Sequence, residues 1–195
     1  MEKTSSLSKG FDLLEFCKKY DLDLQRTANQ LGVKIPKAKF KKVRQLSEAK
    51  NGLMRASGDN SDEVKFYAEK WIELATCPEE LSDIFDELSA DKAQGNDNRG
   101  ELYTKANNKF KKLCFAKIKT SNLQELKDLH LLIKDRAYEK VDIELFKKWG
   151  DKAHNLKELA ELHEALDDYL GLEPFDKLSK DVLVRLASFH GFEPK

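Results

Sequence analysis

The sequence predicts an all-α protein, either a multi-helix bundle or a short α-solenoid of about ten helices. Apolar residues recur three and four positions apart along most of the chain, which is the period of a helix face. Charged residues make up 36% of the composition, and they are mostly Lys and Glu, which favour helix. With 9 Gly and 4 Pro, the chain has few of the residues that a turn-rich β fold needs.

In the N-terminal half we expect five helices, which begin near Ser8, Leu24, Pro36, Asp62 and Pro78. A proline suits the first turn of a helix, because the N–H that it lacks has no partner there in any case. The fourth of these helices carries Phe66, Trp71 and Leu74. The fifth carries Leu81, Ile84, Phe85 and Leu88.

The polar segment 95–100, bounded by two glycines, is the clearest linker. It predicts an N-terminal helical region over residues 1–94 and a C-terminal helical-hairpin region over residues 101–195, unless the two form one continuous domain. After the linker we expect helices near residues 101–119, 122–136, 142–153, 156–170 and 179–190.

Two segments of the C-terminal half, 122–130 and 155–163, share six of nine residues at an offset of 33. This offset accommodates a helical hairpin, so the match predicts a 33-residue helical-hairpin repeat. Each segment opens with a cap arrangement, in which Ser121 precedes Gln124 by three residues and Asn155 precedes Glu158 likewise. The alternative is that Leu- and Glu-rich helices resemble each other by chance.

A weaker match aligns Trp71, Ala75, Glu80, Leu81 and Leu88 with Trp149, Ala153, Glu158, Leu159 and Leu166. We expect both tryptophans to be core anchors rather than binding residues.

The cysteines predict a reducing, cytoplasmic environment. Cys17, Cys77 and Cys114 lie too far apart for a CxxC motif, and an odd count argues against a disulfide framework. Each is expected to act as a small buried hydrophobe. No stretch approaches the roughly 18 apolar residues that span a bilayer, and no apolar run of signal-peptide length follows Met1. We therefore expect no membrane span.

Two basic stripes can contact a phosphate backbone or an acidic partner. Residues 24–47 and 102–124 hold many Lys and Arg and no acid. Residues three and four apart share a helix face, so the candidate binding residues are Lys34, Lys37, Lys41, Arg44, Lys105, Lys109, Lys112 and Lys119. Alternatively, the acid-rich segment 57–90 neutralises the stripes within the fold, or the stripes are only solvated.

Residues 24–33 resemble the front of a helix-turn-helix motif. Ala28 stands at its small position and Gly32 at its turn, and the helix after Pro36 would then read the major groove. Thr27 and Lys41 depart from the motif, because they occupy positions that are usually apolar.

Arg185 and His190 resemble the Arg-x4–6-His motif of the all-helical HEPN ribonucleases. The resemblance implies that Arg185 stabilises a phosphate and that His190 acts as an acid or base. Leu186 departs from the pattern, since a polar residue typically follows the arginine in that family.

The stretch 176–194 also resembles part of the ribosome-binding domain of mitochondrial LETM-type proteins and the SAP helical hairpin. Each resemblance covers about 20 of the 195 residues and consists of leucine spacing closed by Gly-Phe. We interpret the stretch as a helix that is capped by Ser179 at its start and Gly191 at its end.

We predict no metal site and no cofactor. His130 and His163 lie on apolar stripes of the two similar segments, so we expect half-buried packing residues, and no Cys lies near enough in sequence to complete a zinc site. The pair Asp151 and His154 approaches the spacing of a di-iron motif but stands alone.

The leading interpretation is a non-catalytic helical interaction protein, an adaptor, regulator or effector that binds an unknown protein partner. The first alternative is a nucleic-acid-binding protein that uses the basic stripes at 34–44 and 105–119. The second is a HEPN-like ribonuclease.

Overall fold

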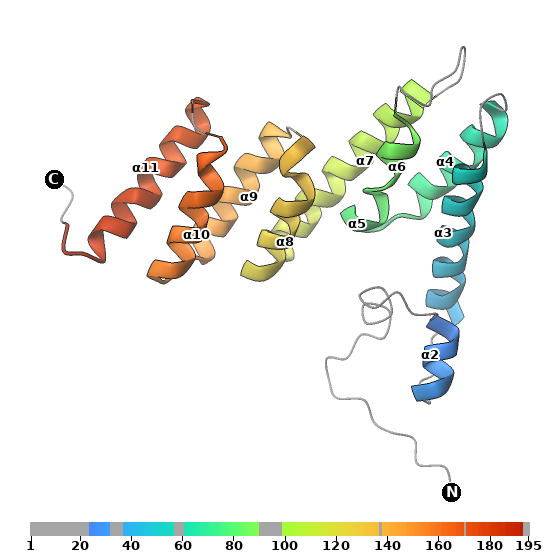
Figure 1. Cartoon of the computed structure of the whole chain (residues 1–195), viewed down its shortest axis with the longest axis horizontal. Helices are drawn as coiled ribbons and strands as arrows, with labels where there is room; N and C mark the ends of the chain where they lie inside the picture. The colour runs from blue at the N-terminus through green and yellow to red at the C-terminus, as the bar shows by residue number, and fades with distance from the viewer. Residues whose placement is uncertain are drawn as a thin grey trace, which may run out of the picture. The chain divides into compact units, whose positions relative to one another are not determined.

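The computed structural model describes residues 24–31, 37–56, 61–89, 99–136, 138–169 and 171–192, and every regular element in these ranges is a helix (Figure 1). The all-α prediction is therefore confirmed. The chain divides into two compact units, residues 1–48 and 49–195. Within the described ranges no helix is long and apolar enough to cross a membrane. The helix expected from Ser8 lies outside these ranges, as does most of the linker at 95–100.

The first unit contains α2 (Leu24–Leu31) and the start of α3 (Lys37–Arg55), which ends in the second unit. Gly32, the turn residue of the helix-turn-helix resemblance, lies outside the described residues, so that motif stays a prediction. The remaining elements belong to the second unit and are α4 (Ser61–Leu74), α5 (Pro78–Leu81), α6 (Ile84–Glu87), α7 (Arg99–Thr120), α8 (Leu123–Ile133), the short 3-10 helix η2 (Lys134–Arg136), α9 (Glu139–Lys152), α10 (Leu156–Asp167) and α11 (Glu173–Ser188).

Helix α7 lies at the centre of the second unit. It packs against α4, α5 and α6 and also against α9. Helix α8 packs on α9, while α10 and α11 pack on each other and on α9. Helices from both sides of the segment 95–100 therefore share one unit.

The buried side chains of α7 explain its contacts on two sides. They are Leu102, Ala106, Phe110, Cys114 and Ile118. A step of four residues advances about 40° beyond one full helical turn, so this stripe winds around the helix from one neighbour to the next. Phe110 lies at its middle, with its ring 5.4 Å from that of Phe85 in α6 and 5.7 Å from that of Tyr138, the residue before α9.

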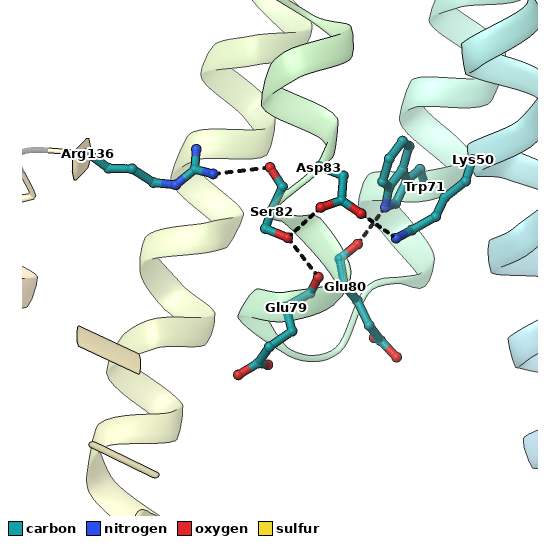
Figure 2. Close-up of polar contacts among 7 residues, drawn as sticks. All are labelled: Lys50, Trp71, Glu79, Glu80, Ser82, Asp83 and Arg136. Carbon is teal, nitrogen blue, oxygen red and sulfur yellow. Dashed lines mark hydrogen bonds and ion pairs between the residues drawn. The ribbon is translucent and has the colours of Figure 1, made fainter. Parts of the chain in front are cut away.

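The single helix expected from Pro78 is instead two short helices, α5 and α6, separated by Ser82 and Asp83 (Figure 2). The break leaves the Ser82 carbonyl without a helical partner, and the Arg136 guanidinium of η2 donates to it at 3.2 Å. Lys50 pairs with Asp83 at 3.1 Å, and the Trp71 indole N–H donates to the Glu80 carbonyl. These tertiary contacts compete with a continuous helix and hold the break in place.

Two expected caps are wrong. The N-cap of α8 is Asn122, not Ser121, because Asn122 and Glu125 exchange side-chain and backbone hydrogen bonds as a capping box. Ser179 is buried inside α11, which starts at Glu173 with Pro174 in its first turn. The end of α11 is as expected: Gly191 has φ 84°, and the N–H of Phe192 donates to the Ala187 carbonyl.

The expected face of α4 is wrong at Phe66, which is 59% exposed. Val64, Ala68 and Ile72 are buried in its place, on the same side as Trp71. Trp71 and Trp149 are both buried, so the prediction of two core anchors is confirmed. Cys114 is buried and Cys77 half-buried, whereas Cys17 lies outside the described residues.

Replacing Gly52 of α3 by Ala is expected to destabilise the second unit by roughly 1–3 kcal/mol, since an added methyl would overlap the Tyr67 ring. A methyl group added at Gly100 of α7 would meet open space, so Gly100→Ala is expected to be neutral or stabilising. Urea denaturation followed by circular dichroism measures both variants. Equal effects of the two substitutions would contradict a close approach at Gly52.

Candidate functional site

The first basic stripe falls in the first unit. Lys41 and Arg44 are exposed, and Arg44 pairs with Glu48 at 2.9 Å one turn further along α3. Lys34 lies outside the described residues, and of Lys37 only the backbone is described. The structure does not place this stripe relative to the second one, so a role of the two stripes in binding stays a prediction.

The second basic stripe lies on α7, where several lysines have partners within the unit. Lys105 pairs with Glu69 at 2.9 Å, and Lys117 pairs with Glu79. Lys109 donates to the carbonyls of Ile72 and Glu73 at the end of α4. Lys112 and Lys119 are exposed. The acid-rich segment therefore neutralises part of this stripe inside the fold.

Arg185 closes the end of α9. Its guanidinium donates to the Gly150 carbonyl at 2.8 Å and to the Ala153 carbonyl. His190 is exposed beyond the last residue of α11. A guanidinium that already satisfies helix-terminal carbonyls has fewer donors to offer a phosphate.

A pocket of about 860 Å³ lies between the turn that joins α8 to α9 and the turn that joins α10 to α11. Both turns lie at the same end of their helices (Figure 1). The pocket is lined by Lys134, Asp135, Glu139, Asp142, Asp168, Tyr169, Gly171, Leu172, Glu173, Pro174 and Phe175. Its volume is within the range of sites that hold a small molecule or a few side chains.

The part of the pocket formed by the turn between α10 and α11 depends on the local conformation of the chain. Gly171 has φ 92°, a left-handed conformation that favours glycine, and its N–H donates to Asp176 at 2.9 Å. This turn lets α11 begin directly afterwards, with Glu173 and Pro174 in its first turn. The turn thereby brings Tyr169 and Phe175 together, with 4.8 Å between their rings.

The pocket is strongly acidic. Four exposed carboxylates line it, those of Asp135, Glu139, Asp168 and Glu173, against the single ammonium of Lys134. The buried carboxyl of Asp142 adds a fifth acid. The field in the pocket therefore favours a cation.

Asp142 is the most perturbed of these acids. The residue is 1% exposed, and its carboxyl lies beside the Tyr169 hydroxyl and the Tyr138 backbone. Burial raises the pKa of Asp142 to about 6, although the nearby Tyr169 hydroxyl and the Tyr138 backbone favour the ionised form. Burial of a carboxylate is costly, and groups with a pKa shifted in this way concentrate at functional sites.

Tyr169 belongs to a cluster of aromatic rings with His130, Phe146 and Phe175. The Tyr169 hydroxyl is buried beside the Asp142 carboxyl, with which it interacts. Burial, followed by the negative charge of Asp142, raises the pKa of Tyr169. The ring of His130 lies 5.2 Å from that of Phe146, and burial followed by the charge of Lys134 lowers the pKa of His130. His130 is thus a buried packing residue, while His163 is half-buried.

No family model matches this chain, and comparison with curated proteins and with solved structures gives no match. The described residues also contain no group of three or more His, Cys, Asp or Glu side chains that could hold a metal ion.

Asp142 and Tyr169 were not among the site residues predicted from the sequence. One signal could have found Asp142: it stands three residues before Leu145 and four before Phe146, so an acid occupies the apolar face of α9. Tyr169 carries no such signal, because its burial depends on how α10 and α11 pack.

Asp142→Asn is expected to stabilise the protein by roughly 1–3 kcal/mol above about pH 7 and to have little effect near pH 4. The pKa of Asp142 is raised from 3.8 to about 6, so the folded state binds its proton more tightly than the unfolded state does. The wild type therefore loses stability as the pH rises from about 4 to 6 and does not regain it. Thermal unfolding across this pH range measures the effect, with the exposed Glu144→Gln as the control. A gain in stability of Asp142→Asn that is independent of pH would contradict this prediction.

Arg185→Met is expected to lower the free energy of unfolding by roughly 1–3 kcal/mol, because charged hydrogen bonds to two carbonyls of α9 are lost. His190→Ala should change it by less than about 0.5 kcal/mol, since His190 is exposed. Chemical denaturation compares the two. A neutral Arg185→Met would argue against a structural role.

Proposed function

We propose that this chain is a non-catalytic interaction module built of helical hairpins, and that it binds a basic segment of a partner protein in the acidic pocket. The observation that carries the proposal is the pocket itself, which is lined by five acidic residues and one lysine at two neighbouring interhelical turns. Matching of opposite potentials steers association and selects partners more than it sets raw affinity.

The 33-residue repeat of hairpins that the sequence predicts is consistent with this proposal. Asn122 and Asn155 each accept a hydrogen bond from a glutamate N–H at the start of α8 and α10. The two turns of the pocket are equivalent at the 33-residue offset, at which Asp135 corresponds to Asp168 and Asp142 to Phe175. Solenoid proteins present equivalent turns side by side and bind their partners along such surfaces.

The contacts of α7 favour a protein partner over a nucleic acid. Glu69 and Glu79 pair with lysines of the second stripe, and Lys109 binds α4 carbonyls. To bind a nucleic acid, these lysines would have to give up their partners within the unit and pair with phosphates instead. The acidic pocket would repel a phosphate backbone.

Apolar side chains beside the pocket suit a peptide. Leu172 lines the pocket and is 52% exposed, and Pro174 is exposed next to it. An extended basic segment can therefore place methylene stems on apolar surface and charged groups near the carboxylates.

Fluorescence anisotropy with a labelled Lys/Arg-rich peptide tests the proposal. Wild type is expected to bind the basic peptide, with an affinity that falls as salt rises. The double substitution Asp135→Asn and Asp168→Asn should weaken binding about tenfold, because two rim charges are lost. The matched control is Glu144→Gln with Glu164→Gln, which removes two exposed acids from α9 and α10 outside the pocket.

Two results would overturn the proposal. One is the absence of basic-peptide binding at low salt. The other is an equal loss in the control variant, which would reduce the effect to net charge. Labelled DNA and RNA in the same assay test the alternatives: salt-sensitive binding would favour the basic stripes, and RNA cleavage that is lost in His190→Ala would favour the ribonuclease.

A further inference from the structure

The charges of this chain are separated along its length. Residues 1–48, the first unit, hold 11 Lys and Arg against 6 Asp and Glu, a net charge of +5. Since the whole chain is neutral, the second unit, residues 49–195, carries −5. Opposite charges on two parts of one molecule let its copies attract one another, because the positive part of one copy can meet the negative part of the next.

The exposed acids of the pocket have no basic partner within the described ranges. The residues that form no ion pair there are Asp135, Glu139, Asp168 and Glu173. The acid-rich segment 57–90 differs, since Glu69, Glu79 and Asp83 each pair with a lysine of the second unit. The negative charge of the pocket is therefore available to a group from outside the unit.

The first basic stripe has the complementary character. Its segment 34–44 holds six basic residues and no acid, with apolar residues between them. Lys41 and Arg44 are exposed, and the pair of Arg44 with Glu48 is exposed on both sides, so it holds Arg44 weakly. The pocket offers the matching chemistry, because its carboxylates lie beside the exposed apolar side chain of Leu172.

We propose that the basic segment bound in the acidic pocket is the first basic stripe, residues 34–44, of a second copy of this chain. This inference rests on the proposed function, because it names the partner whose basic segment enters the pocket. Each copy carries one such stripe and one such pocket, so two copies close into a dimer when each stripe binds in the pocket of the other copy.

The attachment of α3 favours a second copy over the pocket of the same chain. Arg44 precedes Lys50 by fewer than two turns of α3, and Lys50 is held by the Asp83 carboxylate between α5 and α6. Gly52, further along α3, packs closely against Tyr67 of α4. The pocket is built by other elements, namely η2, α9, α11 and the turn before α11. The helix that carries the stripe is therefore fastened to elements that do not form the pocket.

Sedimentation velocity of the full chain tests this contact. At low salt, the weight-average mass of the wild type is expected to rise with protein concentration and to approach that of a dimer. Added salt should return the protein to the monomer, because it screens exposed charges.

Charge reversal identifies the two surfaces. The pocket variant Asp135→Lys with Asp168→Lys should weaken self-association at least about tenfold, because like charges then meet. The stripe variant Lys41→Glu with Arg44→Glu should have the same effect for the same reason. An equimolar mixture of the two variants should associate again, since each stripe then meets a pocket of opposite charge on the other variant.

The matched control for the pocket variant is Glu101→Lys with Glu144→Lys. It reverses two exposed acids outside the pocket and should leave self-association unchanged. Far-UV circular dichroism shows whether each variant is folded.

The inference fails on any of three results: a wild type that stays monomeric at low salt, an equal loss of self-association in the control, or a mixture of the two reversed variants that does not associate. The labelled basic peptide separates this inference from the proposed function. If the peptide binds and depends on Asp135 and Asp168 while the wild type stays monomeric, the interaction module stands and the second copy is not its partner. If no basic peptide binds, the proposed function fails as well.

Discussion

The packing of Phe110 between two neighbours is the constraint on which the second unit depends. Its ring contacts Phe85 of α6 on one side and Tyr138 at the start of α9 on the other. The Arg136 guanidinium lies over both phenylalanine rings, 4.6 Å from the centre of Phe85 and 5.4 Å from that of Phe110, and also binds the Ser82 carbonyl. One apolar side chain and one cation thereby fix where α9 begins relative to the helices before it.

The position of α9 in turn determines the character of the pocket. Val141, Leu145 and Phe146 are buried on the face of α9 that packs in the unit, and Asp142 is carried into the same environment. The local rule that buried positions are apolar is broken at this residue. Foldable sequences keep such local conflicts few, and those that remain concentrate where a protein binds or reacts. This conflict is the physical reason to seek the function near Asp142 rather than along the lysines of α7.

Much of the fold could be predicted from the sequence, because helix periodicity, Pro78 and Gly191 are local signals that act within a few residues. The prediction failed where tertiary contacts outweigh local ones. Leu81 and Ile84 were expected in one helix and are both buried, yet the helix is broken between them, where residues distant in sequence, Lys50 and Arg136, contact Asp83 and Ser82.

The candidate site was harder to predict than the fold. The lysines of α7 stood out because charge patterns are visible in a sequence, whereas their pairing with Glu69 and Glu79 depends on how α4, α5 and α7 pack. Asp142 and Tyr169 come from different hairpins, and no spacing in the sequence brings them together. Ser179 looked like a cap only because the helix start at Glu173 has no side-chain cap to announce it.

The basic side chains that close helix ends have a consequence for how the unit comes apart. Lys109 of α7 binds carbonyls at the end of α4, and Arg185 of α11 binds carbonyls at the end of α9. Each of these helices is thus completed by a residue from a later helix. Detachment of α11 would leave the last carbonyls of α9 without their Arg185 donors. The C-terminal turn of α9 would then be more prone to unfold. The unfolding of neighbouring helices in the second unit is therefore coupled by these terminal hydrogen bonds as well as by the apolar contacts between the helices.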